Sequence, residues 1–227
     1  MPMILSGGGG YEKNPDAYEL FFKSVDRTKP VLYICFANLP DTFVASYGKF
    51  TAMMASHGIY CTRLCNDISV FDEFFPDGIG GIYCAGGNTF RLLKILKESG
   101  GDKKIIDFVR NGGAYIGSSA GAIIAGSDIQ PITFMDANAV VLKDTSGLDM
   151  MRGYATIAHY GDAATELKNS EWYASTEALA SDYPRLIALS EEAAIVIDGD
   201  HASVLGADTL VYENGEKRII PNGGLLF

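Results

Sequence analysis

Short apolar runs alternate with amphipathic segments through the first half of the chain. Apolar runs of this length, bounded by glycine and other turn residues, predict strands that are buried on both faces. The predicted strands are residues 3–5, 31–36, 59–64, 80–84 and 114–116. Helices are predicted at residues 16–25, 41–56, 70–75, 90–96 and 103–110. Asp41 is expected to cap the second of these helices, which ends near Ser56. Asn88 or Thr89 is expected to cap the helix at 90–96. This alternation predicts a mostly parallel sheet covered by helices on both faces.

The pattern changes after Gly126. Residues 128–149 are irregular, residues 154–158 form a candidate strand that ends at His159, and residues 162–179 are a predicted helix. Further short strands are predicted at residues 186–189, 194–198, 202–205 and 209–212. The turn signals Gly199-Asp200 and Asn214-Gly215 separate some of these strands, so we expect a short antiparallel C-terminal extension. The chain shows no linker and no internal repeat, and we expect residues 1–227 to form a single domain.

Composition narrows the functional classes. The chain has 227 residues, of which 48% are hydrophobic and 20% charged, as in a globular protein. The net charge of −10 and the sequence pI of about 4.7 argue against a nucleic-acid partner, because an acidic surface repels phosphates. No apolar run approaches the roughly 20 residues that span a bilayer, so we expect no membrane partner. The first residues are too short an apolar run for a signal peptide, and we expect a cytoplasmic location with the four cysteines as free, reduced thiols.

The stretch from Gly112 to Gly126 carries the clearest candidate chemistry. Gly117, Ser119 and Gly121 fit the G-x-S-x-G pattern of a nucleophile elbow, in which a serine sits on a sharp turn from a buried strand into a helix. Such a turn lifts the hydroxyl above the sheet, and we favour Ser119 as nucleophile. Ser118 competes with it and would cap the helix. The alternative for the whole stretch is a close-packed turn without chemistry.

A serine hydroxyl needs a base, and the base needs an orienting group. Three histidines are available. His57 is placed at a helix end and His201 in a turn, whereas His159 follows a predicted strand, so His159 is the favoured base. The acids Glu191, Glu192, Asp136 and Asp128 all lie in loops, and the pattern does not choose among them. The candidate oxyanion donors are the Ala120 N–H, which follows the nucleophile, and the Gly87 N–H.

A run of glycines follows the first predicted strand. Residues 6–10 read Ser-Gly-Gly-Gly-Gly, which could cradle a phosphate, but the run lacks the lysine and hydroxyl residue of a P-loop. We expect it to form a tight crossover at the edge of an active site. A nucleotide-binding protein that uses these glycines with Gly86 and Gly87 is an alternative.

Together, the segments 86–90 and 113–122, the pair His159-Tyr160 and Glu191 resemble peptidase family S51, which includes aspartyl dipeptidase and cyanophycinase. The resemblance covers nearly the whole chain. It implies a glutamine-amidotransferase-like fold, a three-layer α/β/α sandwich, with serine in place of the usual cysteine nucleophile. By this similarity Ser119 is the nucleophile, His159 the base and Glu191 the orienting acid. Asp136 matches a family aspartate loosely and is a supporting acid only, and Glu192 departs from the family, which has glycine there.

The resemblance also implies a function. It indicates a serine peptidase that cleaves small aspartyl peptides, Asp-X dipeptides, through an acyl-enzyme, with neither a metal nor a cofactor. Hydrolysis of β-aspartyl-arginine, as by cyanophycinase, is one alternative, and a catalytically silent binding module on the same fold is another. An aspartate side chain requires a cation. The candidate cations, which the sequence does not rank, are Arg91, Lys143, Arg152 and Lys168.

Overall fold

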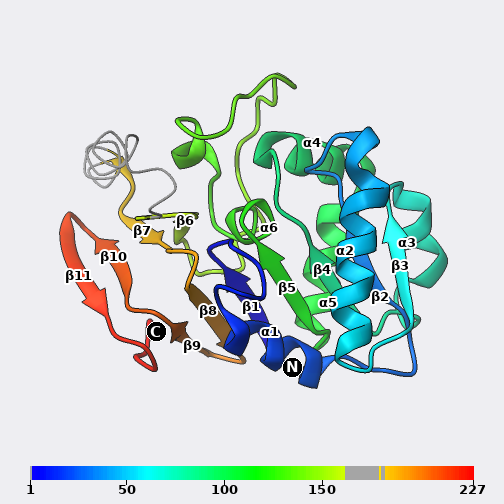
Figure 1. Cartoon of the computed structure of the whole chain (residues 1–227). Helices are drawn as coiled ribbons and strands as arrows, with labels where there is room; N and C mark the ends of the chain where they lie inside the picture. The colour runs from blue at the N-terminus through cyan, green and yellow to red at the C-terminus, as the bar shows by residue number, and fades with distance from the viewer. Residues whose placement is uncertain (1, 162–178, 180–181) are drawn as a thin grey trace.

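The computed structural model describes residues 2–161, 179 and 182–227. Within these residues, seven strands form the main sheet in the order β3-β2-β4-β5-β1-β8-β9 (Figure 1). Strands β3 to β1 of this order are parallel, and β8 and β9 continue the sheet in antiparallel fashion. The strands are β1 (Met3–Ser6), β2 (Val31–Ile34), β3 (Thr62–Cys65), β4 (Gly81–Cys84), β5 (Tyr115–Ser118), β8 (Ala193–Asp198) and β9 (His201–Gly206).

Helices cover both faces of this sheet, which confirms the predicted α/β/α layering. Side chains alternate between the two faces along each strand. Ile4, Val31 and Ile116 pack in one apolar cluster with α1 and α2, whereas Leu5 and Leu32 belong to the cluster under α4 and α5. The helices are α1 (Pro15–Ser24), α2 (Phe43–Ser56), α3 (Ile68–Phe74), α4 (Thr89–Ser99), α5 (Gly101–Arg110) and α6 (Ala120–Ile123), with short 3-10 turns η1 (Pro40–Thr42) and η2 (Gln130–Ile132).

A second sheet stands beside the first, with strand order β11-β10-β7-β6. Its strands are β6 (Ala155–Ile157), β7 (Arg185–Ala188), β10 (Thr209–Glu213) and β11 (Glu216–Ile220). The β7-β10-β11 part is antiparallel as expected, but β6 pairs with β7 in parallel, and the β8–β9 hairpin belongs to the main sheet. Strand β11 was not predicted, because four of its five residues are exposed and its sequence is largely charged.

Helix boundaries differ from the predicted ones where local capping decides them. The prediction that Asp41 caps a helix is wrong: Asp41 lies inside η1, and α2 begins at Phe43 without a side-chain cap. Asp67 caps α3 through the Ser69 N–H (2.9 Å), which starts that helix earlier than predicted. Asn88 caps α4 through the Arg91 N–H (2.9 Å), as one of the two predicted alternatives. The predicted helix at 162–179 lies almost entirely outside the described residues.

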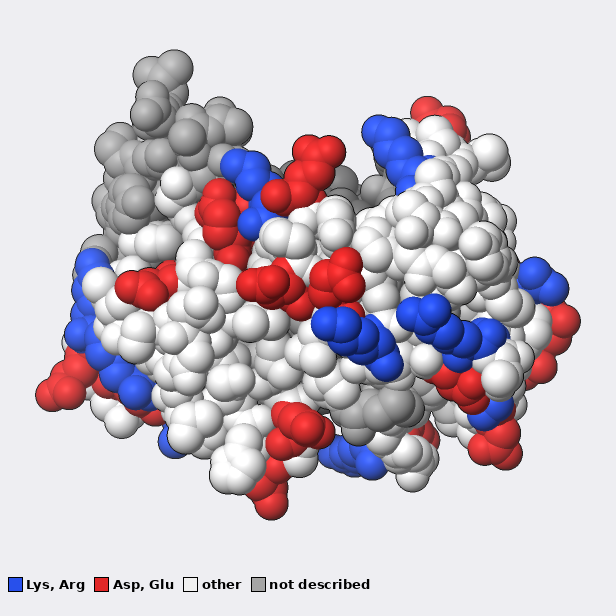
Figure 2. Space-filling model, turned by 60° about the horizontal axis from the view of Figure 1, so that its bottom comes forward, with Lys and Arg blue, Asp and Glu red and all other residues white. Residues whose placement is uncertain are grey.

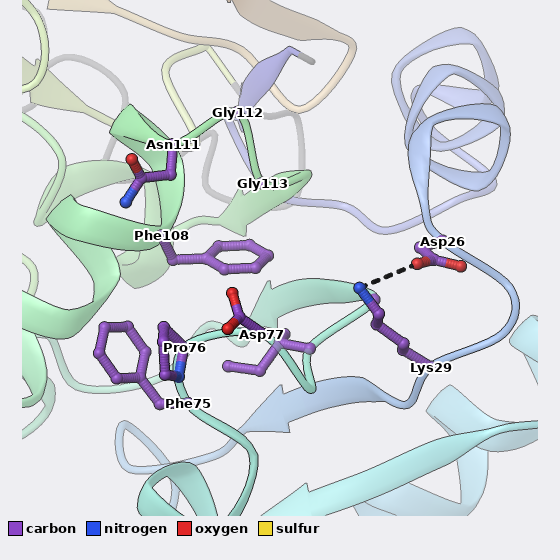
Figure 3. Close-up of a pocket in the computed structure, with 11 residues that line it drawn as sticks. Asp26, Lys29, Phe75, Pro76, Asp77, Phe108, Asn111, Gly112 and Gly113 are labelled. Carbon is purple, nitrogen blue, oxygen red and sulfur yellow. Dashed lines mark ion pairs between the residues drawn. The ribbon is translucent and has the colours of Figure 1, made fainter.

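The amino and carboxyl ends of the parallel strands border different features of the molecule. At their amino ends lies a cavity of about 230 Å³, lined by Phe75, Phe108, Gly113 and the ion pair of Asp26 with Lys29 (3.2 Å) (Figure 3). The loops that follow the carboxyl ends lie at the opposite edge. In open parallel sheets, the carboxyl edge is where ligands usually bind.

Acidic and basic side chains both lie on the face that Figure 2 shows, among a large uncharged surface. Acidic residues outnumber basic residues in the sequence, but on this face Lys and Arg lie among them. None of the helices in the described part of the chain combines the length and the apolar run needed to cross a bilayer.

The four cysteines are free, and three of them are fully buried. Burial raises the pKa of Cys35, Cys65 and Cys84 to about 12. Since the thiolate is the reactive form, these three thiols are protected both by their pKa and by their inaccessibility.

We therefore expect a single fast-reacting thiol, that of the partly exposed Cys61, when the folded protein is titrated with a thiol reagent at pH 8. All four thiols should react after denaturation. A second fast thiol in the folded protein would contradict the packing around the carboxyl ends of β2, β3 and β4.

Candidate active site

The chain turns sharply at Ser119, directly after β5. Ser119 has φ of 52° and ψ of −111°, values that L-residues rarely adopt. A Cβ placed on Gly117 would lie 2.3 Å from the Gly121 carbonyl oxygen, and one on Gly121 would lie 2.2 Å from the Cys84 carbonyl oxygen. The two glycines of the G-x-S-x-G pattern are thus required by the close approach of α6 to the strands.

The hydroxyl of Ser119 meets an imidazole. Its Oγ lies 2.8 Å from His159 Nε2. Ser118, the alternative nucleophile, is instead the last residue of β5 and is buried. The structure therefore brings together the favoured serine and the favoured histidine, which are separated by 40 residues in sequence.

His159 and Glu191 form a pair carried by the second sheet. His159 follows β6 and Glu191 follows β7, two strands that pair in parallel. His159 Nδ1 lies 2.7 Å from Glu191 Oε1, and the two side chains are only 26% and 14% exposed. Because an ionised carboxylate only accepts hydrogen bonds, Nδ1–H donates to Glu191, and in the neutral ring Nε2 accepts from the Ser119 hydroxyl. His159 has a φ of 56°, a second unusual backbone conformation at this site.

Two candidate oxyanion donors flank the serine. Ala120 is the first residue of α6, and a Cβ placed on Gly86 would lie 3.2 Å from Ser119 Cβ. Gly87 has a φ of 134°, and a Cβ there would lie 2.6 Å from the Ala37 carbonyl oxygen, so glycine is required. Within the described residues, the N–H groups of Gly87 and Ala120 have no hydrogen-bond partner.

Asp136 binds the start of α4. Its Oδ2 accepts a hydrogen bond from the Thr89 N–H (2.7 Å), and the neighbouring Ala137 carbonyl accepts one from Asn88 Nδ2 (3.0 Å). Asp136 thus binds the positive, amino-terminal end of the α4 dipole. The N–H that it binds belongs to Thr89, which follows Gly87 by two residues. None of its hydrogen bonds among the described residues goes to Ser119, His159 or Glu191.

The other candidates of the sequence lie elsewhere. His57 caps the end of α2, with Nδ1 2.8 Å from the Met53 carbonyl oxygen and its ring stacked on Phe22, and His201 is exposed at the start of β9. Glu192 is exposed and pairs with Lys13 (3.4 Å). The Asp128 carboxylate accepts from the Gln130 N–H (2.8 Å).

The candidate cations are dispersed. Arg91 lies in the first turn of α4, where its Nε donates to the Phe36 carbonyl (3.2 Å). Lys143 is exposed in the segment after η2. Arg152 pairs with Asp200 (2.8 Å) and lies over the Phe227 ring. Lys168 lies outside the described residues. In the part of the chain that the structure describes, no group of three His, Cys, Asp or Glu side chains is placed to hold a metal ion.

The glycine run after β1, expected at the edge of an active site, lies against His159 and Glu191, but the sequence did not show which residues it would contact. Gly8 lies against the His159 ring and Gly9 against Glu191. The only signal was the run of glycines itself, which is typical of close backbone approach but does not say to what.

The arrangement can activate a hydroxyl for attack on an electrophilic carbon. A base in contact with the hydroxyl accepts its proton, the carboxylate stabilises the imidazolium that forms, and backbone N–H groups can stabilise an oxyanion. The geometry fits acyl transfer.

Comparisons with known proteins agree with the resemblance seen in the sequence. An uncharacterized peptidase of Listeria monocytogenes is 35% identical over 123 residues, which cover 52% of this chain and only 56% of that relative. Peptidase E of Escherichia coli O6:K15:H31 is 28% identical over 217 residues, covering 93% of this chain and 92% of that protein.

Solved structures share the fold. A Listeria monocytogenes protein provisionally named peptidase E matches with a TM-score of 0.72 and 25% identity, over 90% of this chain and 98% of that one. A peptidase from an acI-B1 actinobacterium matches with a TM-score of 0.76 and 21% identity, over 99% and 96% of the two chains. A sequence profile of peptidase family S51 matches residues 3–205. The chain belongs to peptidase family S51.

Proposed function

We propose that this protein is a serine peptidase that hydrolyses small aspartyl peptides, with Ser119 as nucleophile, His159 as general base and Glu191 as the acid that orients the base. The observation that carries the proposal is the pair of hydrogen bonds on the imidazole, 2.8 Å to Ser119 Oγ and 2.7 Å to Glu191 Oε1. These contacts give each ring nitrogen the partner that a Ser-His-acid triad requires.

In the first half of the reaction, Ser119 Oγ attacks the carbonyl carbon of the scissile peptide. His159 Nε2 takes the hydroxyl proton, and Glu191 stabilises the imidazolium. The carbonyl oxygen becomes an oxyanion, for which the N–H groups of Gly87 and Ala120 are the available donors. His159 then gives the proton to the leaving amine, the C–N bond breaks, and the acyl group remains on Ser119 as an ester.

In the second half, a water molecule replaces the amine. The oxygen of the water attacks the ester carbon while His159 Nε2 takes a proton from the water. The second oxyanion collapses, the bond to Ser119 Oγ breaks, and the serine recovers its proton from the imidazolium. The enzyme returns to its starting state with no external cofactor in the proton balance.

The proposed substrate class rests on similarity to family members. The family resemblance implies aspartyl peptides, and a peptidase E relative aligns with 93% of the chain. The substrate carboxylate requires a cation near the carboxyl ends of the strands. Arg152 does not meet this requirement, because it lines a cavity with Met3 and Gly112 at the opposite edge and is paired with Asp200.

Ser119→Ala should lower kcat for an Asp-X dipeptide by about 10⁴-fold or more, since only binding and oxyanion stabilisation remain. It should also abolish labelling by a fluorophosphonate probe. Thermal unfolding of the variant serves as the folding control. Unchanged hydrolysis would refute the assignment of the nucleophile, and a wild-type protein that the probe does not label would indicate a silent binding module.

Glu191→Gln should lower kcat by about 10³–10⁴-fold with little change in KM, because an amide fits the space but favours the wrong imidazole tautomer. Glu192→Gln is the matched control: this neighbour is exposed and pairs only weakly with Lys13 at the surface. Its kcat should stay within about twofold of wild type, the result expected when only a surface pair is lost. Equal losses in the two variants would remove Glu191 from the mechanism.

Arg152→Gln should leave both kcat and KM for Asp-X dipeptides unchanged, because its guanidinium is occupied by Asp200 far from the carboxyl edge. A KM that rises for Asp-X but not for Ala-X dipeptides would show that this arginine reads the substrate carboxylate after all. Steady-state kinetics on the two dipeptide series separates the outcomes.

A further inference from the structure

The last residue of β1 and the loop that follows it contact all three residues of the proposed triad. Four consecutive positions, Ser6 to Gly9, each contact one of them, either through the backbone or through the space left by a missing side chain. None of these four residues has a role in the mechanism derived above.

Two adjacent carbonyl groups hold the nucleophile and the base. The Ser119 N–H donates to the Ser6 carbonyl oxygen at 3.0 Å, and the His159 N–H donates to the Gly7 carbonyl oxygen at 2.9 Å. Gly7 is itself fixed by its N–H bond to the Ala193 carbonyl oxygen (3.0 Å). The distance between the Ser119 and His159 main chains is therefore set by one peptide unit of this loop.

The next residue, Gly8, supports the imidazole. A Cβ at Gly8 would lie 2.3 Å from Cε1, 2.8 Å from Nδ1 and 2.9 Å from Nε2 of His159. All three separations are shorter than real Cβ contacts, so a side chain here requires the ring or the loop to move. The buried backbone of Gly8 thus lies against the imidazole at Cε1, the carbon between the two hydrogen-bonded nitrogens.

Gly9 completes the series. A Cβ there would lie 2.9 Å from Glu191 Cβ and 2.5 Å from Lys13 Cγ. The backbone of Gly9 therefore lies directly against the segment that carries Glu191.

We propose that Gly8 is a positioning residue of the peptidase: its bare Cα is the surface against which the His159 imidazole rests, so the loop sets the angle at which the ring meets Ser119 and Glu191. This inference rests on the proposed function. It assigns the glycine run to alignment of the triad and not to phosphate binding.

Gly10 provides a matched control. It lies in the same loop and has a positive φ, 73° against 122° for Gly8, but a Cβ at Gly10 would have no atom within 4 Å. Both Gly8→Ala and Gly10→Ala strain the backbone, Gly8→Ala more because a φ of 122° lies beyond the left-handed helical region, and only Gly8→Ala also crowds the imidazole. A signal from the ring itself, compared between the two variants, separates displacement of the ring from loop strain.

The test measures kcat and KM for an Asp-X dipeptide in both variants, together with the proton NMR signal of the His159 Nδ1–H, which lies far downfield when it bonds to a carboxylate. Gly8→Ala should lower kcat by about 100-fold, the loss typical of a misplacement of about 1 Å, with KM nearly unchanged. The downfield signal should shift or vanish. Gly10→Ala should keep both kcat and the signal close to wild type.

Equal kcat values and unchanged NMR signals in the two variants would overturn the inference while leaving the peptidase assignment intact. If wild type neither cleaves aspartyl peptides nor reacts with a fluorophosphonate, the function fails instead, and the NMR comparison still decides whether Gly8 positions the ring.

Should Gly8→Ala not fold, Ser6→Ala carries the test. The buried Ser6 hydroxyl lies 3.4 Å from both the Gly8 N and the Gly8 carbonyl oxygen, and removing it frees Gly8 without a clash. We expect kcat to fall several-fold at constant KM. An unchanged kcat in a folded Ser6→Ala protein would overturn the proposal.

Discussion

The close approach of α6 to the ends of β4 and β5 is the constraint on which the site depends. Helix and strands can meet at this distance only because Gly117 and Gly121 have no side chains. The chain therefore has to turn within one residue, and Ser119 takes a conformation that costs about 1–3 kcal/mol. The same turn exposes the serine hydroxyl and leaves the Ala120 N–H free of partners among the described residues. The close approach of α6 to the strands therefore accounts for the glycines, for the exposed hydroxyl and for the N–H left unpaired within the part of the chain that the structure describes.

The second sheet contributes the other half of the site as a preassembled pair. The Leu189 N–H bonds to the Ile157 carbonyl oxygen and the Tyr160 N–H to the Leu189 carbonyl oxygen, both at 2.9 Å, so the segments that carry His159 and Glu191 are tied together. The main sheet carries Ser119. Ser119, His159 and Glu191 thus lie where the two sheets meet, and the distances between them depend on the contacts between the sheets.

Much of this arrangement could be predicted from local sequence. The G-x-S-x-G frame located the turn, and His159 followed because the other two histidines were placed at a helix end and in a turn. The acid could not be chosen from local pattern, since Glu191 and Glu192 are adjacent in one loop and differ only in which way each faces. The contact of Gly8 with the imidazole escaped prediction, as did β11, because neither distant backbone contacts nor pairing of a charged edge strand leaves a periodic signal.

Strand β1 lies between β5 and β8, whose residues follow it in the chain by more than a hundred positions. Contacts this distant in sequence form late, after most of the polypeptide is available. A chain made only as far as Ser119 therefore has β5 to pair with β1, but it lacks β8 and the segment that bears Glu191. Ser119, His159 and Glu191 can therefore meet only once the chain has been made past residue 191, so a partly synthesised protein carries the serine without its full set of neighbours.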